Sequence, residues 1–141
     1  MLFRSIIDPK KILENEAIIP ASGTKCQQCG VDVTVKENVV VEPHGFKNIE
    51  IAEKVHVPEN AAGFLFVRSS LSRKGIFISS GVYDPGFSGA AGCTIYNMGN
   101  DPLCLEAGDR IAQMVFFECN AASQYNGKYQ GSTSGESKGW K

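Results

Sequence analysis

Hydrophobic and polar residues alternate along several short segments of the chain. The pattern is clearest in residues 31–35 (VDVTV), 49–51 (IEI) and 55–57 (VHV). A period of two is typical of strands that bury one face and expose the other. These three segments are therefore predicted to be strands.

Two further segments, 39–41 (VVV) and 64–67 (FLFV), are apolar throughout. Continuous apolar runs of this length predict strands that are buried on both faces. Turn-forming residues separate the predicted strands, at positions 43–45, 58–60, 99–102 and 107–109. Short strands at this spacing predict an all-β sandwich or jelly roll.

One short helix is predicted near the N-terminus. Asp8 is a suitable N-cap, Pro9 suits the first helical position, and Ile12 and Leu13 follow on one face.

The segment from Tyr125 onward (YNGKYQGSTSGESKGWK) has no periodic apolar pattern. Such a segment cannot bury enough apolar surface to fold alone, and a disordered terminus is the simpler interpretation. However, it carries Tyr129, Trp140 and several lysines among glycines and serines. A flexible lid that closes over a planar, anionic ligand is the alternative.

Composition narrows the classes of function. The length of 141 residues favours a single domain. The net charge of −1 gives no overall positive field that would attract nucleic acid. No apolar run approaches the roughly 20 residues of a membrane span. The N-terminus, MLFRSIIDPKK, is charged too early for a secretory signal. We therefore expect a soluble, cytoplasmic protein without a nucleic-acid or membrane partner.

The five cysteines include one Cys-x-x-Cys pair, Cys26 and Cys29. An odd count without a signal peptide argues against a disulfide framework. The pair could form half of a zinc site or a redox pair, although ordinary reduced cysteines are the simpler interpretation.

Four stretches combine charged and small polar residues beside predicted strands: CGVDV from Cys29, RSSLSR from Arg68, GVYDPGFSG from Gly81 and GDRIAQ from Gly108. Each has a simple structural explanation, since Asp84 suits a turn and Arg68 with its serines suits a solvated loop. The alternative for RSS is a phosphate-binding turn of guanidinium, hydroxyl and backbone N–H donors.

In this order, the four stretches resemble the first four motifs of the dUTPase and dCTP deaminase superfamily, and GKYQGSTSG (127–135) resembles the fifth. The N-terminal helix and the Asp-Pro-Gly of the third motif look closest to the deaminase and archaeal branch. The resemblance implies a distorted β jelly roll (a β-clip) that forms a homotrimer with active sites between subunits. It implies a nucleotide hydrolase domain over 1–124 and a flexible arm over 125–141 that closes over the site.

The resemblance also implies catalytic roles. Asp84 would be the general base for the water that attacks the α-phosphorus, with Mg²⁺ held mainly by the substrate phosphates and water. Asp32 would help to orient this base or the hydrated metal, unless it is only a strand-end aspartate. Further substrate contacts would come from the other motifs: Arg68, Ser69, Ser70 and Gln113 at the phosphates, Gly81 and Val82 in the third motif, and Lys128, Tyr129 and Gln130 in the arm.

Phe87 stands where the family has an aromatic residue against the deoxyribose ring. A flat apolar wall would offer no partner to a 2′-hydroxyl and would disfavour ribonucleotides. Phe87 as an ordinary core residue is the alternative.

Position 94 separates the two chemistries of the superfamily. The deaminases need a glutamate there, to activate water at C4 of cytosine, and this chain has Thr94. A threonine hydroxyl cannot act alone as a general base near neutral pH. We therefore predict a dUTP diphosphatase that acts on deoxyuridine triphosphate or a related deoxynucleotide. A dCTP deaminase or dCTP-acting relative, and a catalytically silent nucleotide sensor, are the alternatives.

Overall fold

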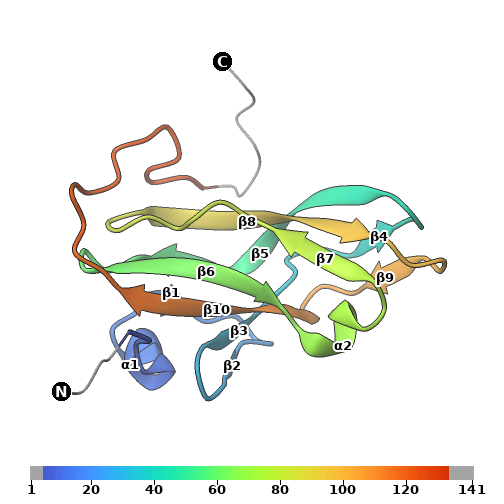
Figure 1. Cartoon of the computed structure of the whole chain (residues 1–141), viewed down its shortest axis with the longest axis horizontal. Coiled ribbons are helices and arrows are strands. Elements are labelled where there is room, and N and C mark those ends of the chain that lie inside the picture. Colours follow the sequence, from blue (N-terminus) through green and yellow to red (C-terminus); the bar gives the residue numbers. More distant parts are fainter. Residues whose placement is uncertain (1–4, 134–141) are drawn as a thin grey trace.

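The computed structural model describes residues 5–133 of the chain. Two four-stranded sheets form two layers, with strand orders β1-β5-β8-β7 and β2-β3-β10-β6, and β4 pairs with β9 at one end (Figure 1). The strands are β1 (Ile18–Ile19), β2 (Lys25–Cys26), β3 (Val31–Thr34), β4 (Val39–Val41), β5 (Phe46–His56), β6 (Ala61–Val67), β7 (Ile76–Ser79), β8 (Ser88–Asn97), β9 (Leu103–Leu105) and β10 (Arg110–Glu118). This is the predicted distorted jelly roll.

Apolar residues from both sheets meet between the layers. The fully buried side chains include Ile18, Ile51, Ile95, Ile111 and Phe116. Ile18, Ile51 and Ile95 belong to one large sheet, and Ile111 and Phe116 belong to the other. Each of the two large sheets therefore contributes a face to a single core.

The predicted N-terminal helix is confirmed as α1 (Pro9–Glu14), with the Asp8 carboxylate accepting a hydrogen bond of 2.9 Å from the backbone N–H of Lys10. A second short helix, α2 (Ser69–Ser72), follows Arg68. The sequence predicted only a turn there. Four residues without a side-chain cap are too few to give a helical pattern.

Two details of the strand prediction are wrong. The segment 49–51 and residues 55 and 56 belong to a single strand, β5, whose pairing with β8 shifts between Glu50 and Lys54. The apolar runs of β4 and β6 are not buried on both faces in this chain, since Val40 is 47% exposed and Phe66 is 51% exposed. Their alternate residues point away from the core, on faces that this single chain leaves open.

The turn of the Cys-x-x-Cys segment lies flat against β10. A Cβ atom at Gly30 would come within 2.4 Å of the Met114 carbonyl oxygen, so only glycine allows this approach. All five cysteines, which lie within the described residues, are free.

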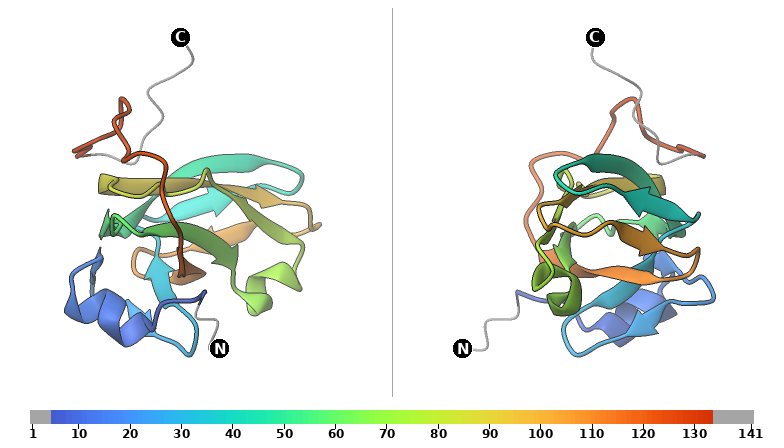
Figure 2. Two further views of the ribbon diagram at one scale, coloured as in Figure 1. Left: turned by 60° about the vertical axis from the view of Figure 1, so that its left-hand side comes forward. Right: turned by 90° about the vertical axis from the view of Figure 1, so that its right-hand side faces the viewer.

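The C-terminal segment crosses from one layer to the other. It leaves the end of β10 and rises past the edge of the molecule to the level of β8 (Figures 1 and 2).

The part of the chain from 5 to 133 contains no helix long and apolar enough to span a membrane.

Candidate functional site

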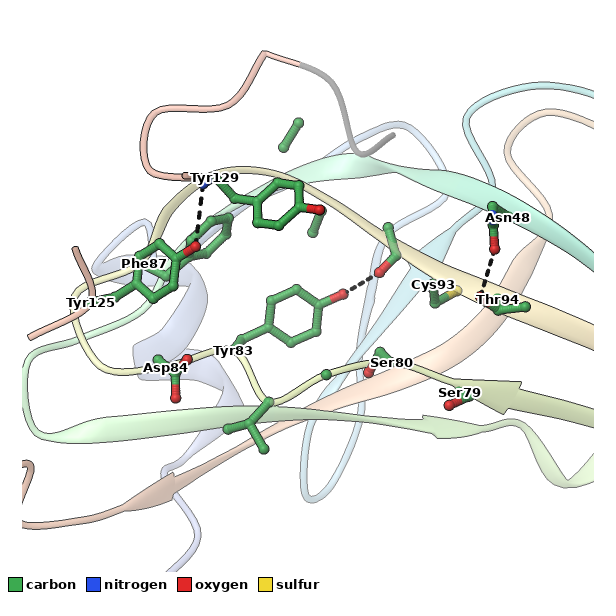
Figure 3. A pocket seen from close by; sticks show the side chains of 15 residues that line it. Asn48, Ser79, Ser80, Tyr83, Asp84, Phe87, Cys93, Thr94, Tyr125 and Tyr129 are labelled. Carbon is green, nitrogen blue, oxygen red and sulfur yellow. Dashed lines mark hydrogen bonds between the residues drawn. The ribbon is translucent and has the colours of Figure 1, made fainter. Parts of the chain in front are cut away.

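A cavity of about 350 Å³ lies between the segment that follows β7, residues 90–94 of β8 and the C-terminal segment (Figure 3). Asp84, Phe87 and Tyr129, three residues singled out from the sequence, line it together with Gly81 and Val82. The fold therefore brings together the predicted residues of the third motif and the arm tyrosine.

A tight turn presents Asp84 to this cavity. The Phe87 N–H donates to the Asp84 carbonyl oxygen at 3.0 Å, and Gly86 has a φ of 82°. This is the geometry of a type II turn, in which Pro is common at the second position and Gly suits the positive φ of the third. The aspartate is thus part of a turn, and its carboxylate is left exposed at the cavity.

Tyr83 anchors the same segment to both sheets. Its backbone exchanges two hydrogen bonds with Gly63 of β6, at 2.9 and 3.0 Å, and its hydroxyl donates to the Gly92 carbonyl oxygen of β8 at 2.7 Å. Burial raises the pKa of the Tyr83 hydroxyl above its ordinary value, with a smaller contribution from Cys93. The phenol stays protonated and acts as a fixed donor.

Cys93 of β8 also lines the cavity and is 7% exposed. Burial raises the pKa of its thiol to about 12. The sulfur is therefore a neutral thiol at physiological pH, rather than a nucleophilic thiolate.

The end of the cavity opposite Asp84 is polar (Figure 3). Asn48 of β5 and Thr94 of β8 are register partners, and the Thr94 hydroxyl donates a hydrogen bond of 2.7 Å to the Asn48 Oδ1. The sequence drew attention to Thr94 but not to Asn48. Only the register between two strands far apart in the sequence brings Asn48 to this position, so no local pattern could have identified it.

Aromatic side chains form the end of the cavity near Asp84. The Phe87 ring is 7% exposed and packs edge-on against the Tyr125 ring, with centroids 5.4 Å apart. The Tyr129 N–H donates to the Tyr125 hydroxyl at 3.3 Å, and Lys128 Nζ lies 5.3 Å from the centroid of the Tyr129 ring.

Hydrogen bonds hold the arm beside this cavity. Gln130 accepts from the Ser88 N–H through Oε1 and donates to the Gly86 carbonyl oxygen through Nε2, both at 2.8 Å. The backbone N–H of Gly131 donates to the Ser88 carbonyl oxygen, and that of Ala90 to the Ser132 carbonyl oxygen, again at 2.8 Å. The described part of the arm therefore lies along the start of β8 of its own chain. Trp140 and the last two residues of the fifth motif lie outside the described residues.

The remaining predicted residues form a second cluster around Asp32. This carboxylate is 2% exposed and accepts from Arg110 Nη1 at 3.0 Å and from Gln27 Nε2 at 2.7 Å, while Arg68 Nε lies 3.9 Å away. Asp32 is thus a buried, ion-paired residue within β3. Gln113 is its register partner on β10.

The second cluster and the cavity are separate in the chain. Asp32, Arg68 and Gln113 are not among the described residues that line the cavity, and the same holds for Ser69 and Ser70, which lie exposed at the start of α2. Within residues 5–133, no group of three or more His, Cys, Asp or Glu side chains could hold a metal ion.

Comparisons with known proteins agree on the family and the fold. The family model described as dUTPase matches residues 15–139. A dCTP deaminase of Pyrococcus horikoshii is 38% identical over 105 residues, which cover 73% of this chain and 67% of that protein. A deoxyuridine 5′-triphosphate nucleotidohydrolase of Methanocaldococcus jannaschii is 31% identical over an alignment of 139 residues, covering 74% of this chain and 86% of that protein.

Solved structures of both kinds of enzyme share the fold. The EIAV dUTPase superposes with a TM-score of 0.66 at 23% identity, covering 79% of this chain and 95% of that one. The dCTP deaminase of Agrobacterium tumefaciens superposes with a TM-score of 0.69 at 12% identity, covering 81% of this chain and 49% of that one.

Proposed function

Because the chain belongs to the dUTPase family, we propose that it is a dUTP diphosphatase, which hydrolyses dUTP to dUMP and pyrophosphate. The observation that carries the proposal is the distribution of charge in the cavity. Among the described residues that line it, Asp84 is the only carboxylate, and the opposite end holds Asn48 and Thr94. The cavity thus offers a base for hydrolysis at one end and no acidic group for deamination at the other.

Asp84 is proposed to act as the general base. Its carboxylate is exposed at the cavity, and the backbone that carries it is held by a hydrogen-bonded turn. A carboxylate in this position can accept a proton from a water molecule as that water attacks the α-phosphorus. Phosphoryl transfer depends chiefly on such positioning and on neutralisation of charge.

The second cluster, together with the serines that follow Arg68, is proposed to bind the phosphates. Arg68, Ser69, Ser70 and Gln113 offer a guanidinium, hydroxyl and amide donors, and the Arg68 side chain is 32% exposed. Asp32 accepts from Arg110 and lies near Arg68, so it would position these cations rather than touch the nucleotide. Because the cluster does not line the cavity of its own chain, we infer that a homotrimer brings it to the cavity of a neighbouring subunit.

Mg²⁺ fits this arrangement as a partner of the substrate. The ion prefers oxygen ligands and is commonly held by one or two carboxylates together with substrate phosphates and water. Among the described residues no group of three or more His, Cys, Asp or Glu side chains could hold the ion, so the substrate phosphates and water would supply most of its ligands and leave Asp84 to act as the base. Bound in this way, Mg²⁺ would neutralise charge on the phosphates.

The aromatic end of the cavity is proposed to contact the deoxyribose and the arm is proposed to cover the nucleotide. The apolar ring of Phe87 lines the cavity near Asp84 and would contact the sugar. Tyr129, which belongs to the arm, lines the same cavity and would lie over the nucleotide. A 2′-hydroxyl would meet no polar partner on the Phe87 ring, which disfavours ribonucleotides.

A dCTP deaminase is the second candidate, because several relatives bear that name, among them one that is 38% identical to this chain. Thr94 argues against it. Its hydroxyl is a donor to Asn48, and no carboxylate among the described residues lies at that end of the cavity.

The products distinguish these functions. We expect pyrophosphate from dUTP in the presence of Mg²⁺, little from dTTP and UTP, and no ammonia from dCTP. Ammonia from dCTP would establish the deaminase. Tight binding of nucleotide without either product would indicate a nucleotide sensor.

A further inference from the structure

The Asn48–Thr94 pair is a polar contact at the end of the cavity opposite Asp84, and the proposed hydrolysis does not use it. Thr94 Oγ1 donates to Asn48 Oδ1 at 2.7 Å, and both side chains line the cavity. The residues lie on neighbouring strands, β5 and β8, as register partners. The position of the pair is therefore set by the sheet rather than by a loop.

This hydrogen bond fixes which chemical group the pair presents to a ligand. A threonine hydroxyl has one proton, and here it points to the asparagine oxygen. The asparagine oxygen is thereby engaged and the amide orientation is set. The Asn48 amide nitrogen, which can only donate, is then the group available to a ligand. Asn48 is exposed, so a ligand in the cavity can reach it.

Asp84 and the Asn48–Thr94 pair lie at opposite ends of the cavity (Figure 3). On the proposed function, a nucleotide whose α-phosphate lies near Asp84 would extend its base toward the pair. The two pyrimidines differ at C4, where uracil has a carbonyl oxygen that accepts a hydrogen bond and cytosine has an amino group that donates. A fixed amide donor can hydrogen-bond to the carbonyl oxygen of uracil, but it would face another donor in the amino group of cytosine.

We propose that Asn48, oriented by Thr94, recognises the C4 substituent of the pyrimidine and favours a 4-keto base over a 4-amino base. The inference rests on the proposed function, because it takes the cavity as the base-binding site. It assigns Asn48 as a specificity-determining residue and Thr94 as the residue that positions it.

Binding of non-hydrolysable imido analogues of dUTP and dCTP tests the proposal without any need for turnover. The quantity to measure is the ratio of the two dissociation constants, dCTP analogue over dUTP analogue. Asn48→Asp keeps the size of the side chain and the bond from Thr94 but replaces the amide donor by an acceptor. We expect this ratio to fall by about tenfold or more, because the acceptor suits the 4-amino group and repels the carbonyl oxygen.

The matched control is Asn100→Asp, which adds the same charge at an exposed position outside the cavity. Added negative charge weakens the binding of both triphosphate analogues alike. The ratio of their dissociation constants should therefore stay at the wild-type value in this control. An unchanged ratio in Asn48→Asp would overturn the proposal.

Two substitutions at Thr94 test its positioning role. Thr94→Val removes the hydroxyl at nearly constant size, which leaves the Asn48 amide free to rotate. The ratio of the two dissociation constants should therefore fall several-fold. Thr94→Ser restores the hydroxyl and should restore the preference. A wild-type ratio in Thr94→Val would show that Thr94 does not orient Asn48.

The outcome also separates this inference from the proposed function. If the wild type hydrolyses dUTP but Asn48→Asp leaves the ratio unchanged, the recognition role is wrong and the diphosphatase stands. If the ratio shifts as expected but no nucleotide is hydrolysed, the recognition role stands and the diphosphatase is wrong.

Discussion

Asp32 and Arg110 form an ion pair of 3.0 Å that joins β3 to β10, and neither residue is among those that line the cavity of Asp84 in the same chain. Arg68 lies beside this pair, 3.9 Å from the Asp32 carboxylate. The chain thus carries a proposed base and a proposed phosphate-binding cluster as two separate units. On the proposed function, a site that uses both would combine residues of two copies.

Mixed assemblies test this division. Asp84→Asn should lower turnover by at least about 10²-fold, the usual scale for a lost general base, and Arg68→Ala should also lower it strongly. When equal amounts of the two variants assemble together, about a quarter of the sites combine an intact Asp84 with an intact Arg68 from the neighbour. We therefore expect activity well above that of either variant alone.

The control for that experiment mixes Asp84→Asn with the double variant Asp84→Asn/Arg68→Ala, which offers no intact base and should show no recovery. A mixed assembly of the two single variants that stays inactive would show that both units serve the same chain's site.

Truncation after Asn126 tests the arm. This change removes Tyr129 and Gln130 but keeps Tyr125, whose ring packs on Phe87. The lost residues contribute little to the core, so thermal unfolding should stay near the wild-type temperature while turnover falls. Gln130→Ala removes only the two hydrogen bonds to Ser88 and Gly86, and it should give a smaller loss. Full turnover in the truncated protein would mean that the arm has no role in catalysis.

The thiols test the local electrostatics of the cavity. Because burial raises the pKa of Cys93 to about 12, its thiolate form appears only as the pH approaches that value. At pH 8 a small alkylating reagent should modify the exposed Cys29 and Cys104 first and Cys93 last. Mass spectrometry of partly labelled protein measures the order. Labelling of Cys93 as fast as that of Cys104 would contradict the buried environment of β8.

Local patterns were sufficient to predict much of the fold. Alternation in 31–35 identified β3, and Asp8 with Pro9 identified α1. The single long strand β5 was missed because Glu53, polar in the sequence, is 1% exposed and bonded to Thr34. A buried carboxylate with a distant partner breaks the pattern that identifies strands.

The residues of the site differed in how far the sequence could define them. The order of the motifs, through the family resemblance, singled out Asp84, Arg68 and Tyr129, but it could not show that Arg68 is separate from the cavity of its own chain. Asn48 had no motif at all, and only its pairing with Thr94 in the folded sheet gives it a chemical context. Contacts of this kind depend on register and lie beyond any local pattern.

Hydrolysis in water enriched in oxygen-18 tests the central claim most directly. Wild-type protein with dUTP and Mg²⁺ should release unlabelled pyrophosphate and dUMP that carries one heavy oxygen, since water attacks the α-phosphorus. The same incubation with Asp84→Asn should form these products at least about 10²-fold more slowly. Label in the pyrophosphate, or an undiminished rate in the variant, would contradict attack at the α-phosphorus by water that Asp84 activates.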